Sequence, residues 1–221
     1  MRRSALSIRV LPALTSAAVV CVLLATRSFA LDPQKAITQF THRSWGSTYG
    51  IGMVGSITQT TDGYLWISSV SGIFKFDGID FTRLDLDKAG FGSMDPDPSD
   101  SRTALPPILL GARDGSLWIT SLQSVMRLKN GSWKKYGPQD GLPGGNLYAI
   151  CEGNDGSVWA GGRKGLSRFQ DGKWRRYDAE SQIPSGALTA VMEDRENVLW
   201  VAIERDPRFP SSSAVAFLRL G

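Results

Sequence analysis

The sequence predicts an all-β protein built from β-propeller blades, each a sheet of four antiparallel strands, with about four blades in the chain. Three observations lead to this prediction. A tryptophan motif returns at a regular interval, turn-forming dipeptides separate short apolar stretches, and no long helical pattern follows the first thirty residues. The composition agrees with a folded domain, because 42% of the 221 residues are hydrophobic and 21% are charged.

The repeated motif is Asp-Gly, two further residues and Trp. Three copies occur, at 62–66, 114–118 and 155–159, and a weaker fourth copy occupies 196–200. The Trp-to-Trp intervals are 52, 41 and 41 residues, which matches four-stranded blades once the first interval is allowed an insertion. The structural residues of the repeat are therefore Asp62, Gly63, Trp66, Asp114, Gly115, Trp118, Asp155, Gly156, Trp159 and Trp200.

Turn residues divide each unit into strands. Asp-Gly suits the positive φ angles of a tight hairpin between the first and second strands, and Asn197 replaces the glycine in the fourth copy. A second turn is predicted at Asp77-Gly78, Asn130-Gly131 and Asp171-Gly172. The units predicted in this way are 54–85, 107–137, 147–178 and an incomplete fourth at 188–221, with an insertion loop at 86–106.

The two ends of the repeat region leave ring closure open. Ala214–Leu220 is predicted as the third strand of the fourth unit, and residues 37–45 as the fourth strand of a blade whose other strands lie elsewhere. Pairing of these two segments would close a four-bladed ring. Alternatively, the chain is the first part of a larger propeller and has an open edge.

The repeated tryptophans are expected in the core. Burying one aromatic ring of about 150–250 Å² at about 25 cal/mol per Å² contributes several kcal/mol. Repetition at one position of every blade therefore favours packing between sheets over a ligand platform.

The N-terminus has the three parts of an export signal. A basic start precedes the apolar run Val10–Ala25, and small residues stand at Ser28 and Ala30, so residues 1–30 are predicted to be a signal peptide cleaved after Ala30. Arg27 near the cut is unusual, which keeps a retained anchor as the alternative. Apart from such an anchor, or a C-terminal part missing from the chain, no membrane attachment is expected.

The net charge of +4 comes from this segment. Four of the 25 basic residues lie there without an acid, so 21 basic residues face 21 acidic residues in the remainder. A neutral chain gains nothing from counterion release, so no nucleic-acid partner is expected. Cys151 is the one cysteine beyond the signal, which excludes an intrachain disulfide and predicts a small buried strand residue.

Residues 59–66, Gln-Thr-Thr-Asp-Gly-Tyr-Leu-Trp, together with 31–45 and Phe76-Asp77-Gly78, resemble the opening of bacterial two-component regulator propellers. The resemblance covers nearly all of 31–221. It implies a periplasmic sensor domain, which in such proteins is usually joined through a membrane span to a histidine kinase, a diguanylate cyclase or a DNA-binding module. No motif of these output modules occurs in the chain, so the implied function is sensing alone. The implied partner is a small extracellular ligand, for example a saccharide, or a signalling protein.

If a small ligand binds, propeller geometry favours the face formed by the connectors between blades and by the loops between second and third strands. Arg163 is the first choice, because Gly161-Gly162 beside it would allow a close backbone approach. The candidate ligand-binding residues are Gln139, Asp140, Arg163, Lys164, Gln182 and Arg205.

No catalytic residue, metal or cofactor is expected. His42 is the one histidine and has no nucleophile or acid motif beside it. The acidic residues of 86–106 match no calcium-loop spacing. Two alternatives to the sensor are retained: a structural or protein-interaction propeller, which includes a truncated product without signalling output, and, less favoured, an enzyme like the propeller lyases that open cyclic antibiotic esters.

Overall fold

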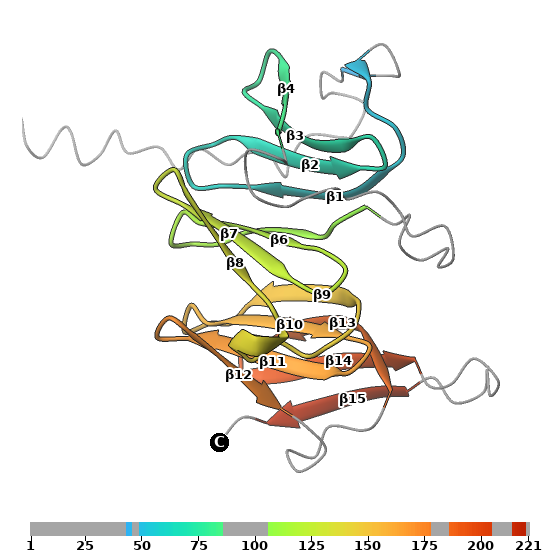
Figure 1. Ribbon diagram of the computed structural model, residues 1–221, viewed down its shortest axis with the longest axis vertical. Helices are drawn as coiled ribbons and strands as arrows, with labels where there is room; N and C mark the ends of the chain where they lie inside the picture. The colour runs from blue at the N-terminus through green and yellow to red at the C-terminus, as the bar shows by residue number, and fades with distance from the viewer. Residues whose placement is uncertain (1–42, 46–48, 86–105, 178–185, 205–213, 220–221) are drawn as a thin grey trace, which may run out of the picture. The chain divides into compact units, whose positions relative to one another are not determined.

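The computed structural model describes residues 43–45, 49–85, 106–177, 186–204 and 214–219, with Glu204 and 214–219 described by their backbone alone. The chain divides into two compact units, 1–44 and 45–221, and the blades all belong to the second. Its described strands form three four-stranded sheets and one three-stranded sheet, and each sheet is antiparallel with its strands in chain order (Figure 1). The prediction of an all-β fold made of propeller blades is confirmed.

The first blade contains β1 (Val54–Gln59), β2 (Leu65–Ser69), β3 (Gly72–Phe76) and β4 (Phe81–Arg83). The second contains β5 (Leu109–Gly111), β6 (Leu117–Thr120), β7 (Val125–Lys129) and β8 (Ser132–Tyr136). The third contains β9 (Leu147–Glu152), β10 (Val158–Gly162), β11 (Gly165–Gln170) and β12 (Lys173–Tyr177). The fourth contains β13 (Ala187–Glu193), β14 (Val198–Glu204) and β15 (Ala214–Arg219). The first strands β1, β5, β9 and β13 are neighbours in this order.

The turn between the first and second strands is the same in all four blades. Its first residue donates its N–H to the carbonyl of the fifth, as from Thr60 to Tyr64 at 3.1 Å and from Asp194 to Val198 at 3.0 Å. The fourth residue has a positive φ, 89° at Gly63 and 61° at Asn197. The prediction that Asn197 takes over the glycine conformation is confirmed, and asparagine tolerates it because its short polar side chain fits the left-handed region.

The aspartates of the motif hold these turns together. Asp114 accepts the N–H of Ser116 at 2.9 Å and forms an ion pair with Arg127 at 2.6 Å and with Lys129 at 2.7 Å. Partial burial alone would raise the pKa of Asp114, but the hydrogen bonds from Lys129 and Ser116 and the charge of Arg127 outweigh it and lower the pKa. The carboxylate therefore stays charged and ties the first turn to β7.

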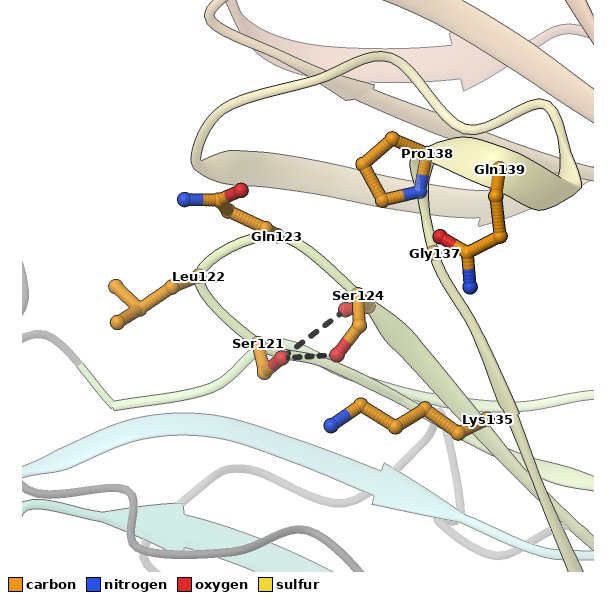
Figure 2. A pocket seen from close by; sticks show the side chains of 8 residues that line it. All are labelled: Ser121, Leu122, Gln123, Ser124, Lys135, Gly137, Pro138 and Gln139. Carbon is orange, nitrogen blue, oxygen red and sulfur yellow. Dashed lines mark hydrogen bonds between the residues drawn. The ribbon is translucent and has the colours of Figure 1, made fainter.

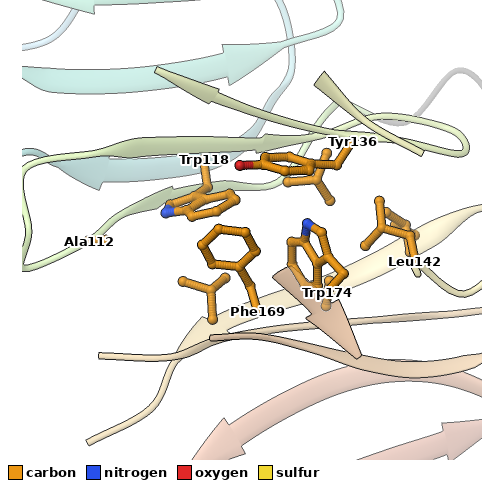
Figure 3. Packing of buried hydrophobic residues seen from close by; sticks show 10 residues of the cluster. Ala112, Trp118, Tyr136, Leu142, Phe169 and Trp174 are labelled. Carbon is orange, nitrogen blue, oxygen red and sulfur yellow. The ribbon is translucent and has the colours of Figure 1, made fainter. Parts of the chain in front are cut away.

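The motif tryptophans pack between successive sheets. Trp66 belongs to a cluster with Leu109 and Leu117 of the second blade, and Trp159 to one with Leu188 and Leu199 of the fourth. In the central cluster, Trp118 meets residues of the third blade, and its ring centroid lies 4.9 Å from that of Phe169 (Figure 3). The predicted core role of these three tryptophans is confirmed, whereas Trp200 of the last blade is partly exposed.

Hydrogen bonds between neighbouring blades supplement the packing. Arg113 in the turn of the second blade donates its N–H to Glu152 of the third at 3.0 Å. In the same way, the N–H of Asn154 reaches Glu193 of the fourth blade at 2.9 Å, and Glu193 also accepts the indole N–H of Trp159 at 3.2 Å. Between the first and second blades, Gly111 stands at the position that Glu152 and Glu193 occupy in the later blades. Its N–H donates to the Thr58 hydroxyl at 2.8 Å.

Trp45, the last residue of the predicted closing strand, packs on the first blade. The centroid of its ring lies 5.0 Å from that of Phe76 and 5.8 Å from that of Phe81. In the same way, Tyr136 at the end of β8 packs on Phe169 and Trp174, the matching residues of the third blade. Residues 37–42 lie outside the described part, and Arg43–Trp45 have no regular secondary structure. The described strands form no closed ring, so the closing strand stays a prediction.

Candidate functional site

The connector between the second and third blades builds one edge of the candidate face. It begins with the short 3₁₀-helix η4 (Pro138–Asp140), which Pro138 opens with a fixed φ angle. Asp140 accepts the N–H of Gly137 at 2.8 Å and so closes the turn, and Gly141 ends it with a φ of 101°. The carboxylate of Asp140 therefore has a structural task in this connector.

A cavity of about 380 Å³ lies between this connector and the loop that joins β6 to β7. Figure 2 shows the loop on one side, the connector on the other, and Lys135 reaching in from β8. Both edges belong to the kind of face on which the sequence predicts a ligand. The lining residues are Ser121, Leu122, Gln123, Ser124, Lys135, Gly137, Pro138 and Gln139.

The polar groups of the cavity can hydrogen-bond a ligand. The hydroxyls of Ser121 and Ser124 are 2.6 Å apart and bond to each other. Lys135 adds an exposed ammonium group and Gln139 an amide. None of the lining residues is a carboxylate, histidine or cysteine.

Arg163 and Lys164 lie at the far end of the same connector, in the loop between β10 and β11. Both are exposed, and the N–H of Arg163 donates to the carbonyl of Asn146 at 2.9 Å. The room beside the two preceding glycines is filled by the protein itself, because a Cβ at Gly162 would lie 2.1 Å from the carbonyl oxygen of Asn146. Gly162 therefore lets the connector backbone come close, and the space beside it, where the sequence predicts a ligand, is occupied by Asn146.

The structure brings only part of the predicted set together. Gln139 lines the cavity, Asp140 is next to it in η4, and Arg163 and Lys164 flank the other end of the connector. Gln182 and Arg205 lie outside the described residues. Sequence reasoning missed the pair of Ser121 and Ser124. Their loop, 121–124, precedes 162–165 by one period of 41 residues, so the predicted position of Arg163 and Lys164 could have pointed to it. Lys135 carries no signal in the sequence.

Outside the cavity, the thiol of Cys151 is poorly suited to act as a nucleophile. Cys151 is half-buried, and burial raises its pKa to about 12, so the thiol is protonated at neutral pH and a poor nucleophile. His42 lies outside the described residues. In the described ranges no three His, Cys, Asp or Glu side chains are placed to hold a metal ion. A search of the same ranges finds no helix that could span a membrane.

Comparison with known families assigns part of this face. The sequence model of the two component regulator propeller matches residues 141–164, which run from the connector through β9 and β10 to Lys164. These residues are similar to a two-component regulator propeller repeat. No curated protein matches the sequence.

Solved structures share the blade fold of this chain. One is the extracellular domain of a protein assigned to a hybrid two-component system of B. thetaiotaomicron, with 19% identity, a TM-score of 0.57, and 75% of this chain and 21% of that chain covered. Another, assigned to a one-component system of the same organism, has 13% identity and a TM-score of 0.56, with 80% and 23% covered. This chain therefore spans about a fifth of either structure, and at such identities the likeness shows the fold alone.

An enzyme is also among the similar structures. Virginiamycin B lyase from Staphylococcus aureus is 20% identical, with 76% of this chain and 56% of that chain covered. Its TM-score of 0.48 is too low to support an argument about catalysis in this chain.

Proposed function

We propose that this chain is an exported, periplasmic sensor segment of a two-component signal transduction system, and that it binds a small hydroxyl-rich ligand such as a saccharide at the connector face. The observation that carries the proposal is the match of the two component regulator propeller model to residues 141–164, which include the later part of the connector and the loop with Arg163 and Lys164. Similarity in fold to extracellular domains of signalling proteins supports the same role. Export follows from the predicted signal peptide at 1–30.

The ligand class follows from the chemistry of the cavity. Lys135 and the Gln139 amide offer hydrogen-bond donors, and the Ser121 and Ser124 hydroxyls both donate and accept. A saccharide presents hydroxyls that match such a set without needing a charged partner. The cavity is open to solvent, and its volume of about 380 Å³ is at the small end of ligand sites.

Signal output lies outside the proposed role of this chain. Ligand binding here would have to be transmitted by another polypeptide, or by a further part of a longer protein. The competing interpretations differ in what they predict: a protein-interaction propeller would bind no small molecule at the cavity, and a lyase-like enzyme would turn its ligand over.

Thermal-shift measurements on the full chain with a panel of oligosaccharides test the proposal. A ligand at a hundredfold excess over its Kd stabilises the folded state by about 2.7 kcal/mol and raises Tm. Lys135→Ala and Gln139→Ala are expected to weaken binding of that oligosaccharide about tenfold each, since each removes a donor to the ligand. Lys134→Ala is the matched control, because this neighbour is also exposed on β8 but does not line the cavity.

If no oligosaccharide changes Tm, or if both cavity variants bind like the Lys134→Ala control, the cavity is not a saccharide site. Turnover of a bound oligosaccharide would instead favour the enzyme.

A further inference from the structure

The charges of the second and third blades are unevenly distributed. In each blade the turns between first and second strands and between third and fourth strands lie at one end, and the connectors and the loops between second and third strands lie at the other. We call these the turn end and the connector end. Residues 106–177 are described without a gap, so both ends of these two blades can be compared.

At the turn end, acids lie beside the cations. The nitrogen-to-oxygen distances of the ion pairs there are between 2.5 and 3.2 Å. The pairs are Arg113–Glu152, Arg127–Asp114, Lys129–Asp114 and Arg168–Asp155. Every ion pair found within 106–177 belongs to this end, so its acids largely balance its cations.

The connector end carries cations without such partners. Lys135 on β8 and Arg176 on β12 stand at the same position of their blades, one period of 41 residues apart. Arg163 and Lys164 add two charges in the loop between β10 and β11. All four side chains are exposed, and none of them forms an ion pair with a residue that the structure describes.

The acid at this end does not balance the four cations. Asp140 is the one acid at the connector end within 106–177, and its carboxylate accepts the N–H of Gly137 at 2.8 Å. An excess of cations gives this end a positive potential, which concentrates anions near it. The equal numbers of basic and acidic residues beyond position 30, 21 of each, therefore conceal a separation of charge between the two ends.

One of these cations lies in the cavity itself. Lys135 lines it together with the hydroxyls of Ser121 and Ser124 and the amide of Gln139 (Figure 2). The lining residues include no carboxylate, so the protein does not pair the ammonium group there. A carboxylate or sulfate on the ligand would accept a charge-assisted hydrogen bond from Lys135, which is roughly twice as strong as a bond between neutral groups.

The other cations border the far end of the connector. A Cβ at Gly144 would lie 3.4 Å from Cδ of Lys164 and 3.9 Å from its Nζ, so the ammonium group lies beside the connector backbone. The guanidinium of Arg176 donates to the carbonyl of Lys164 at 3.0 Å and ties this loop to β12. The connector thus has one cation where it leaves the second blade and a group of cations where it enters the third.

We propose that the ligand of this cavity is an acidic oligosaccharide, which places a carboxylate or sulfate group at Lys135 and extends along the connector toward Lys164. The inference rests on the proposed function and narrows its ligand class. The hydroxyls and the amide of the cavity select a saccharide, and the cations of the connector end select an anionic one.

Isothermal titration calorimetry of the full chain with tetragalacturonate and with its methyl ester tests the proposal. The two ligands differ in charge but share their hydroxyls. The acid is expected to bind at least about tenfold more tightly than the ester at low salt, and this preference is expected to shrink in about 1 M NaCl. A sulfated dextran tetrasaccharide and its unsulfated parent tell whether sulfate is accepted in place of carboxylate.

Substitutions that remove charge but keep a donor locate the anionic group. Lys135→Gln is expected to weaken binding of the acid about tenfold and to change binding of the ester less than about twofold. Lys164→Gln is expected to weaken binding of the acid about threefold, because it contacts a later sugar. Lys173→Gln, which removes an exposed cation at the turn end, is the control and is expected to leave both affinities unchanged.

The outcomes separate this inference from the proposed function. If the ester binds as tightly as the acid and Lys135→Gln affects both alike, the site takes neutral saccharides and the inference is wrong, although the proposed function stands. If neither tetrasaccharide nor any other oligosaccharide binds, the proposed function fails as well. Citrate that binds as tightly as tetragalacturonate, or an equal loss in Lys173→Gln and Lys135→Gln, would show attraction of any anion and overturn the inference.

Discussion

The middle of this molecule and its two ends are built from one sequence motif, yet they differ in what the motif buries. Between the second and third blades, Trp118 lies in a cluster with Phe169 and Trp174 and is excluded from water (Figure 3). In the fourth blade, Trp200 follows the same turn but keeps a large exposed fraction, and its indole N–H donates to Asp194 at 2.7 Å. Burial of the motif tryptophan is thus a property of the neighbouring blade.

The largest effect expected from this contrast is at the central tryptophan. Trp118→Ala is expected to lower the free energy of unfolding by about 3–5 kcal/mol, because it leaves a cavity between two sheets. Trp200→Ala is expected to cost less than about 2 kcal/mol, because part of its ring is already in water. Urea unfolding measures both values.

If Trp118→Ala and Trp200→Ala lower the free energy of unfolding equally, the difference in burial between the two tryptophans has no effect on stability. A large loss at Trp200 alone would mean that another surface covers the fourth blade.

A smaller effect is expected at the hydrogen bonds that join the third and fourth blades. Glu193→Ala removes the acceptor of both the Asn154 N–H and the indole N–H of Trp159, and the latter is buried. We expect a loss of about 1–3 kcal/mol in the free energy of unfolding, since a buried donor is left without a partner.

Glu196→Ala is the control for this change, because Glu196 is an exposed acid in the next turn of the same blade. Its effect is expected to stay within about 0.5 kcal/mol. If thermal or urea unfolding shows the same effect for Glu193→Ala as for the control, the contact contributes nothing to the joining of these blades.

The smallest effect is a gain of stability in the middle of the molecule. The indole N–H of Trp118 is buried without an acceptor among the described residues, whereas that of Trp66 donates to the Thr60 hydroxyl at 3.1 Å. Ala112 stands at the position of Thr60 in the second blade. Ala112→Ser is expected to supply the missing acceptor and to raise the free energy of unfolding by about 0.5–1.5 kcal/mol.

A double-mutant cycle with Trp118→Phe isolates this hydrogen bond. Phenylalanine has no N–H, so the gain from Ala112→Ser is expected to vanish in that background. If the gain persists there, it comes from another source.

Much of the blade could be predicted from the sequence because it depends on near neighbours in the chain. The conformation of Asn197 follows from a five-residue turn, and the strands on either side follow from their apolar pattern. The candidate ligand site stays a prediction. The sequence did not show that Asp140 closes a turn or that Asn146 fills the space beside Gly162, because the repeat period does not set the contacts within a connector or between it and the next loop.

The sequence by itself determined the period of 41 residues, the positions of the turns and the fold class, since each depends on local backbone preference and on the alternation of side chains. Only the tertiary structure decided which copies of the motif are buried, because burial requires a second sheet at the right distance. It also decided that Lys135 and the Ser121–Ser124 pair share a cavity with Gln139. These residues come from different strands and loops, and packing of the second blade against its connector brings them together.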